Sequence, residues 1–210
     1  MTRLPMHSIA TLVVTYVVLT VAALLMGDQW LGAWLPLLAK QVDWLMPTEF
    51  ARHALALTPG DGQITLEAVT TVDLHAANRI IPAGTVARSA TLKAYALQHA
   101  AIVFAILAAW PARSLGKRAW LLALGAPCIL LCVSFDIPFV LVGLLRRIWL
   151  DPLATGHATA DPLVVYGAFL QDGGRIGLSI AVAVAAATTV SDPRAAATPV
   201  DGPDAAAAAK

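Results

Sequence analysis

Three charged residues lie inside long apolar stretches of this 210-residue sequence. Asp172 and Arg175 occur in "VVYGAFLQDGGRIGLSIAVAVA", and Asp136 occurs in "CVSFDIPFVLVGLL". One charge in hydrocarbon costs about 2.5 to 3.5 kcal/mol on insertion scales, so such residues normally face the interior of a helix bundle and pair. The pattern predicts a buried acid–base site, and Asp136 with Arg175 is the first-choice pair.

A second pairing is equally compatible with the sequence. Asp172 and Arg175 are three residues apart on one helix and could pair locally, which would leave Asp136 to bond with His99 or Tyr16. Each of these residues falls in an apolar run, at a comparable expected depth. We therefore expect one intramembrane polar layer formed by Asp136, Asp172, Arg175, His99 and Tyr16.

Glycines surround the arginine of this layer. Gly173, Gly174 and Gly177 remove side chains beside Arg175. Such gaps let another helix approach closely, or they let the helix itself distort. We expect these three glycines to serve helix packing or to allow a distortion.

The chemistry open to this layer is limited by its motifs. When two carboxyl groups lie close together, repulsion between their charges raises the pKa of one of them, as in aspartyl proteases. Asp136 and Asp172 are two intramembrane aspartates that could form such a pair. Their surroundings read "SFDIP" and "LQDGG", without the Tyr-Asp and Gly-x-Gly-Asp motifs of intramembrane aspartyl proteases. No Gly-x-Ser-x-Gly is found either. We predict no catalytic residue, with a hydrolase of unknown type as the third alternative.

The composition identifies the environment of these residues. Hydrophobic residues make up 59% of the chain, charged residues 13%, and the mean hydropathy is +0.74, whereas soluble domains are about one quarter charged. The net charge of +1 argues against nucleic acid as a partner. Cys128 and Cys132 lie in an apolar run, unlike zinc ligands, and no metal or cofactor motif is present.

Four apolar runs have the length of a transmembrane helix: 8–26, 94–110, 119–145 and 163–189. An even number places both termini on one side. The basic loop 111–118 predicts that this side is cytoplasmic, together with residues 1–7 and a disordered tail at 190–210. Arg146 and Arg147, in the opposite loop 146–162, conflict with this orientation.

The segment 27–93 between the first two runs is expected on the external face. Residues 28–46 carry tryptophans typical of a lipid interface, Trp30, Trp34 and Trp44, and predict an interfacial helix broken at Pro36.

Residues 53–93 predict a β-rich module that rests on this helix. Two strands meet at "PGDG", and a third follows in "TVARSATLKAY". The predicted fold class is an α-helical integral membrane protein with four transmembrane helices and a small β-containing extracytoplasmic module between the first and second.

This order of parts, with the Trp-rich start of the external segment and "TLKAYALQHAAIVFAILAAWP" as a span ending in proline, resembles the exosortase H-associated membrane proteins. The resemblance covers the chain to about residue 188. It implies a multi-pass protein of the bacterial inner membrane that works beside an exosortase, and it transfers no catalytic residue.

The function expected from these observations is that of a non-catalytic accessory or assembly subunit of a cell-envelope complex. Its partners would be the lipid bilayer and another membrane protein. The alternative is a small ion- or proton-coupled transport component in which the polar layer titrates.

Overall fold

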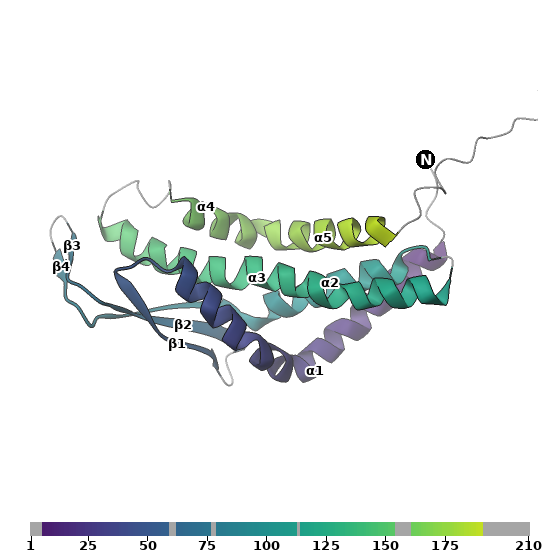
Figure 1. Ribbon diagram of the computed structural model, residues 1–210, viewed down its shortest axis with the longest axis horizontal. Coiled ribbons are helices and arrows are strands. Elements are labelled where there is room, and N and C mark those ends of the chain that lie inside the picture. The colour runs from purple at the N-terminus through teal and green to yellow at the C-terminus, as the bar shows by residue number, and fades with distance from the viewer. Residues whose placement is uncertain (1–5, 59–61, 77–78, 113, 154–160, 191–210) are drawn as a thin grey trace, which may run out of the picture.

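The computed structural model describes residues 6–58, 62–76, 79–112, 114–153 and 161–190, so nearly all of the predicted tail at 190–210 lies outside the described residues. The chain is mostly helical, with a small antiparallel sheet at one end (Figure 1). The helical elements are α1 (Met6–Leu45), α2 (Lys93–Ala109), α3 (Leu115–Leu153), α4 (Pro162–Phe169), the π-helical turn η2 (Leu170–Gly174) and α5 (Arg175–Val190). The strands are β1 (Phe50–Thr58), β2 (Gln63–Thr70), β3 (Leu74–Ala76), β4 (Arg79–Ile81) and β5 (Val86–Leu92).

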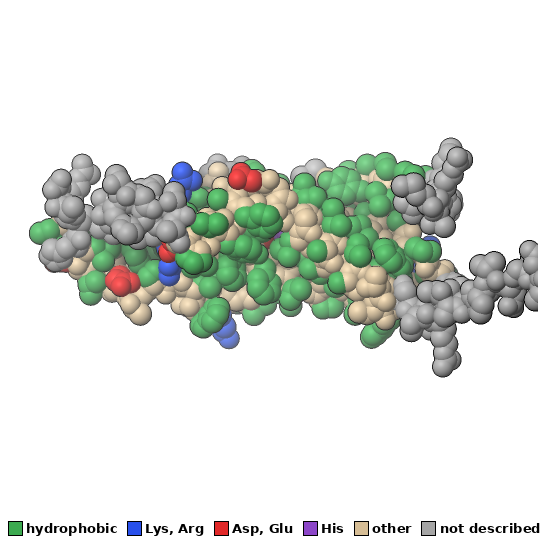
Figure 2. Space-filling model, turned by 90° about the horizontal axis from the view of Figure 1, so that it is seen from above, with side chains coloured by type: hydrophobic (Ala, Val, Ile, Leu, Met, Phe, Trp, Pro, Cys, Tyr) green, Lys and Arg blue, Asp and Glu red, His purple; other side chains and the backbone are tan. Residues whose placement is uncertain are grey.

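Two helical segments are long and apolar enough to cross a membrane, Leu115–Ile148 and Pro162–Val190. A third is present if the two arms of the bent helix α1 count as one span. Helix α2 has 17 residues, about 25 Å, which is short of a hydrocarbon core of about 30 Å. Hydrophobic side chains cover much of the helical part of the face in Figure 2, whereas charges gather toward the sheet. The structure supports a membrane protein with two or three apolar spans, and the fourth span stays a prediction.

The bend in α1 differs from the sequence-based expectation. The helix runs without a break through Pro36 and bends instead by 70° between Ile9–Ala23 and Leu25–Leu45. Pro36 is exposed, so the backbone bond that it removes lies on the outer side of the helix. The opposite face holds the helix in place through buried side chains, those of Leu31, Leu38 and Val42. The prediction of a helix broken at Pro36 was wrong.

The sheet agrees with the strand predictions. Strands β1, β2 and β5 form an antiparallel sheet in the order β1-β2-β5, and β3 and β4 form a separate hairpin. Residues on one side of β2 and β5 are buried in strict alternation, so only one face of the sheet is packed. The buried residues of β5 are Ala87, Ser89 and Thr91.

Helix α3 supports the sheet on this packed face (Figure 1). The Ser89 hydroxyl of β5 donates a hydrogen bond of 2.9 Å to the Leu141 carbonyl oxygen of α3. On the other edge, Arg52 of β1 makes a bidentate ion pair with Asp43 near the end of α1, at 2.6 and 3.0 Å. The module therefore rests on α1, as predicted, and also on α3, which extends beyond the predicted span 119–145.

The basic pair that conflicted with the predicted orientation belongs to α3. Arg146 donates a hydrogen bond of 2.7 Å to Asp161, which caps the N-terminus of α4. The Asp161 carboxylate also accepts from the amides of Leu163 and Val164 at 2.8 and 3.4 Å. Burial raises the pKa of Asp161, but these hydrogen bonds and the charge of Arg146 outweigh it and hold the pKa below 3.8.

Replacement of the cap should lower stability in a pH-dependent way. Asp161→Ala is expected to cost about 0.5 to 2 kcal/mol at neutral pH, the usual range for loss of a helix cap. A carboxyl group with a lowered folded-state pKa stabilises above its unfolded pKa, and this contribution disappears as the pH falls through the folded value. Asp161→Asn keeps a capping oxygen but loses the charge. Unfolding of the detergent-solubilised protein between pH 7 and pH 3 should show a smaller pH dependence for Asp161→Asn than for wild type.

Candidate functional site

The two charges predicted to pair meet at the junction of the helices and the sheet. The Arg175 Nε atom donates to both carboxylate oxygens of Asp136, at 2.8 Å and 2.9 Å. Asp136 is 0% exposed and Arg175 4%. The first-choice pairing of the sequence analysis is therefore present, between α3 and the first residue of α5.

The distortion predicted as one use of the glycines orients Arg175. In η2, Asp172 and Gly173 leave helical geometry, with φ −82° and ψ 17° for Asp172 and φ 110° for Gly173. A positive φ of this size favours glycine because it has no Cβ. The turn leaves Asp172 exposed while Arg175 is buried. The expected polar layer is wrong in this respect, since Asp172 lies outside it.

The helix-packing interpretation of the three glycines does not hold. A Cβ added to Gly173 or Gly177 would meet nothing within 4 Å, so no neighbouring helix approaches there. At Gly174, the atoms within 3 Å of an added Cβ belong to Phe169, in the same kinked segment. Gly173 permits the turn and Gly174 leaves room for Phe169, whereas Gly177 lies in the regular helix α5 and serves neither purpose.

His99 joins the ion pair from α2. Its Nε2 atom lies 3.0 Å from Asp136 Oδ2, and its Nδ1 atom lies 2.6 Å from Ser179 Oγ. The Ser179 hydroxyl also lies 2.9 Å from the Arg175 carbonyl oxygen, in donor geometry. His99 is 1% exposed and Ser179 0%, so the side chains form a closed chain of hydrogen bonds inside the protein.

The sheet and the start of α2 complete the cluster around the arginine. Arg175 Nη2 donates to Thr91 Oγ1 of β5 at 3.3 Å, and the guanidinium carbon lies 4.0 Å from the centre of the Tyr95 ring. A cation over an aromatic ring is worth about 0.5 to 2 kcal/mol, more when desolvated. We call these residues the junction cluster: Asp136, Arg175, His99, Ser179, Thr91 and Tyr95.

The sequence analysis missed three members of the junction cluster. Ser179 follows Arg175 by one helical turn, which places both on one face of α5. Thr91 continues the alternation of buried positions in β5. These spacings were visible in the sequence, but they give no reason to choose these hydroxyl groups over others in the chain. Tyr16, the fifth residue of the expected layer, is 38% exposed on the first arm of α1 and does not join the cluster.

Two proton arrangements satisfy the contacts of His99. A neutral ring protonated on Nε2 donates to Asp136 and accepts from Ser179 at Nδ1. A doubly protonated ring donates to both, and the Ser179 hydroxyl then donates to the Arg175 carbonyl oxygen. The two arrangements differ in the acceptor of the Ser179 proton, which is His99 Nδ1 in the first and the Arg175 carbonyl oxygen in the second.

The chain Ser179–His99–Asp136 has the residue types of a serine hydrolase triad. A nucleophile must reach its substrate, however, and Ser179 has no exposed surface and bonds within its own helix. Among the described residues, no group of three His, Cys, Asp or Glu side chains could hold a metal ion. The junction cluster connects α2, α3, α5 and β5 through buried side chains.

The predicted interfacial tryptophans fall into two groups. Trp44 is 82% exposed near the end of α1. Trp30 and Trp34 are half-buried on the second arm of α1, with ring centres 5.0 Å apart. Both line an apolar cavity on the inner side of the bend.

Comparison of the chain with models of protein families, with curated proteins and with solved structures finds no match.

Proposed function

We propose that this protein is a membrane-embedded accessory or assembly subunit without chemistry of its own. The observation that carries the proposal is the junction cluster, in which one buried ion pair connects four elements. Asp136 comes from α3, Arg175 from α5, His99 from α2 and Thr91 from β5. Such a cluster fixes the sheet on the helices in one geometry.

The energetics of a buried ion pair favour this role. Removing two charges from water costs several kcal/mol each, and their attraction repays this only when the remaining polar atoms are satisfied. Here Asp136 Oδ1 accepts from Arg175 Nε, Asp136 Oδ2 contacts both Arg175 Nε and His99 Nε2, and the guanidinium also donates to Thr91. Because the net gain of such a pair is small, its main effect is to select one arrangement of the elements it joins.

A transport role receives less support from the same residues. An ion- or proton-coupled site must become accessible to water on both sides of the membrane. The four hydrogen-bonding side chains at the centre of the junction cluster, those of Asp136, Arg175, His99 and Ser179, are at most 4% exposed. Asp172, which would provide a second carboxyl group, is exposed and outside the cluster.

A rigidly held sheet offers an edge to a partner. Strands β1 and β5 are the two edges of the sheet, and in the described residues each pairs with β2 alone; β1 also contacts α1, and one face of β5 packs on α3. An extended peptide can add to a free strand edge through backbone hydrogen bonds. The resemblance to exosortase H-associated membrane proteins makes an envelope complex of the inner membrane the proposed context, with the sheet outside and both termini in the cytoplasm.

Purification of the tagged full-length chain in mild detergent, followed by mass spectrometry, tests this function. Wild type should retain one membrane protein in stoichiometric amount. Arg175→Ala should lose it, because the sheet is no longer held in one position. Arg88→Ala is the matched control, since Arg88 lies in the same strand as Thr91 but its side chain is 71% exposed and pairs with Glu67 outside the cluster. A wild-type protein that elutes intact and alone would contradict the proposal.

A further inference from the structure

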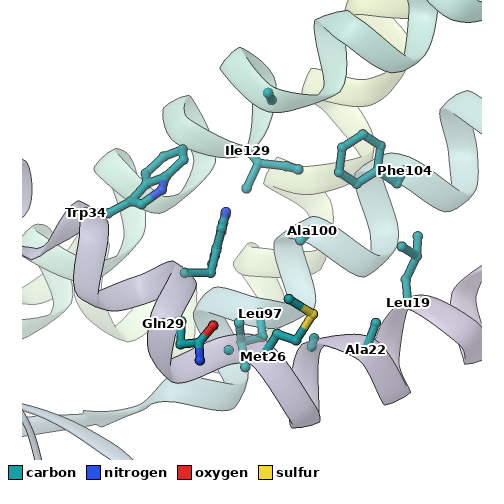
Figure 3. Close-up of a pocket in the computed structure, with 13 residues that line it drawn as sticks. Leu19, Ala22, Met26, Gln29, Trp34, Leu97, Ala100, Phe104 and Ile129 are labelled. Carbon is teal, nitrogen blue, oxygen red and sulfur yellow. The ribbon is translucent and has the colours of Figure 1, made fainter.

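The inner side of the bend in α1 borders a half-open cavity of about 520 Å³. Both arms of α1 form one wall, and α2 and α3 form the other (Figure 3). The volume lies within the range of about 300 to 1,000 Å³ typical of ligand sites. The side chains that define its limits in Figure 3 are those of Leu19, Met26, Trp34, Leu97, Phe104 and Ile129.

The sequence accounts for the cavity. The residues of α1 that line it recur at helical spacing on both arms, so the 70° bend brings two parts of one helix face toward each other. Gly27 allows α2 to cross closely, because an added Cβ would lie 2.6 Å from Leu97 Cδ1. Alanines leave the interior unfilled on all three helices: Ala22 and Ala23 on α1, Ala100 on α2 and Ala126 on α3.

The cavity is apolar apart from one side. Among its lining residues, Gln29 is the only one with an amide side chain, and the indole nitrogen of Trp34 is directed toward the interior (Figure 3). Neither group forms a hydrogen bond with another residue in the part of the chain that the structure describes. An amphiphilic ligand could therefore bury a hydrocarbon chain here and hydrogen-bond at the side of Gln29 and Trp34.

The opening of the cavity is continuous with an exposed apolar surface. Met26, in its wall, is 63% exposed, and Leu25 beside it is 80% exposed. On the first arm of α1, Val14, Val18 and Val21 are 51 to 61% exposed. In a protein of this composition, an exposed aliphatic stripe on an apolar helix is the surface that contacts lipid chains. A lipid can thus enter the cavity from the bilayer without crossing water.

We propose that the cavity binds one acyl chain of a bilayer phospholipid, with the ester region of that lipid at Gln29 and Trp34. The apolar walls match a hydrocarbon chain, the polar pair matches ester oxygens, and the exposed stripe provides the route of entry. Trp30 and Trp34 then act as part of a lipid site as well as anchors. Like the proposed function, this proposal requires that the chain is embedded in a membrane. It does not require a protein partner.

Native mass spectrometry of the delipidated full chain with added 1-palmitoyl-2-oleoyl-phosphatidylethanolamine tests the proposal. Wild type should bind one lipid per chain at low lipid concentration. Ala126→Phe and Ala22→Phe fill the cavity from opposite walls and should each weaken binding by about tenfold or more, equivalent to about 1.4 kcal/mol. Both alanines are exposed at the rim of the cavity, so the folded state should tolerate the two substitutions.

Ala123→Phe is the matched control, because Ala123 is exposed on α3 one turn away and does not line the cavity. It should bind lipid as wild type does. Equal lipid binding by all four proteins would overturn the proposal. The proposal would also be overturned if a second copy of the protein occupied the cavity. That result would appear as a concentration-dependent dimer that Ala126→Phe disrupts. Ala126→Phe should still retain the protein partner. If it binds less lipid but keeps the partner, the lipid site and the proposed function are tested separately.

Discussion

Arg175→Ala is expected to lower the free energy of unfolding by about 3 to 5 kcal/mol, the range seen when one partner of a buried ion pair is removed. The substitution leaves the Asp136 carboxylate 0% exposed without its cation, and it also removes the donor to Thr91 Oγ1. Denaturant or thermal unfolding of the purified protein in one detergent gives the measurement. A change below 1 kcal/mol would show that the pair does not hold the folded state together.

A double substitution separates the net contribution of the ion pair to the free energy of unfolding from the cost of leaving one charge unpaired. Replacement of both Asp136 and Arg175 by leucine removes the unpaired charge, so it should cost much less than Arg175→Ala alone. The two substitutions are in direct contact, and their effects should therefore be strongly non-additive. If the double variant remains stable but loses the protein partner, the junction cluster serves the geometry of the sheet. A double variant as unstable as Arg175→Ala would contradict this account.

The pairing of Asp136 with Arg175 could be predicted because a charged side chain inside a membrane protein has few possible partners. An isolated acid and an isolated base, each in an apolar run, must find each other or another polar group. The strands could be predicted as well, since every second residue of β2 and β5 is buried, the period of two that a strand imposes. These features depend on local composition and on a strong energetic penalty.

The position of the cluster could not be predicted in the same way. Counting residues from the ends of the apolar runs placed Asp136, Asp172 and Arg175 at one depth within a bundle. In the structure, η2 turns Asp172 to the surface, and the sheet meets the helices at Arg175. The turn depends on Gly173 at φ 110°, and glycine in a sequence indicates either distortion or close packing without distinguishing them.

The bend in α1 has a similar explanation. Proline is the usual signal for a break, so Pro36 was expected to interrupt the helix. The bend lies instead between Ala23 and Leu25, and Leu97 of α2 packs against the helix about one turn later, at Gly27. That contact joins residues far apart in the sequence, and no local pattern contains it. The cavity at the bend could not be predicted for the same reason.

Gly143→Leu is expected to have the second large effect, because Gly143 is where α3 and α4 touch. A Cβ at this position would lie 2.7 Å from the carbonyl oxygen of Leu163 and 3.3 Å from its carbonyl carbon. Both are backbone atoms, so a change of rotamer cannot relieve the contact, and α4 must move. Overpacking of this kind typically costs about 1 to 3 kcal/mol, and the bulk of leucine should reach the upper part of that range.

The opposite result is expected at a glycine in the same helix. Gly116 has no atom within 4 Å of an added Cβ, so Gly116→Ala should be neutral or stabilise α3 by up to about 1 kcal/mol, the difference in helix propensity. Gly143→Ala, with a single methyl group, should lie between the two. Unfolding measurements on the three variants in one detergent give the comparison. Equal stability of Gly143→Leu and wild type would mean that α4 does not pack against α3 at Leu163. The packing of α4 on α3 would then not be what positions η2, and with it Arg175, next to Asp136.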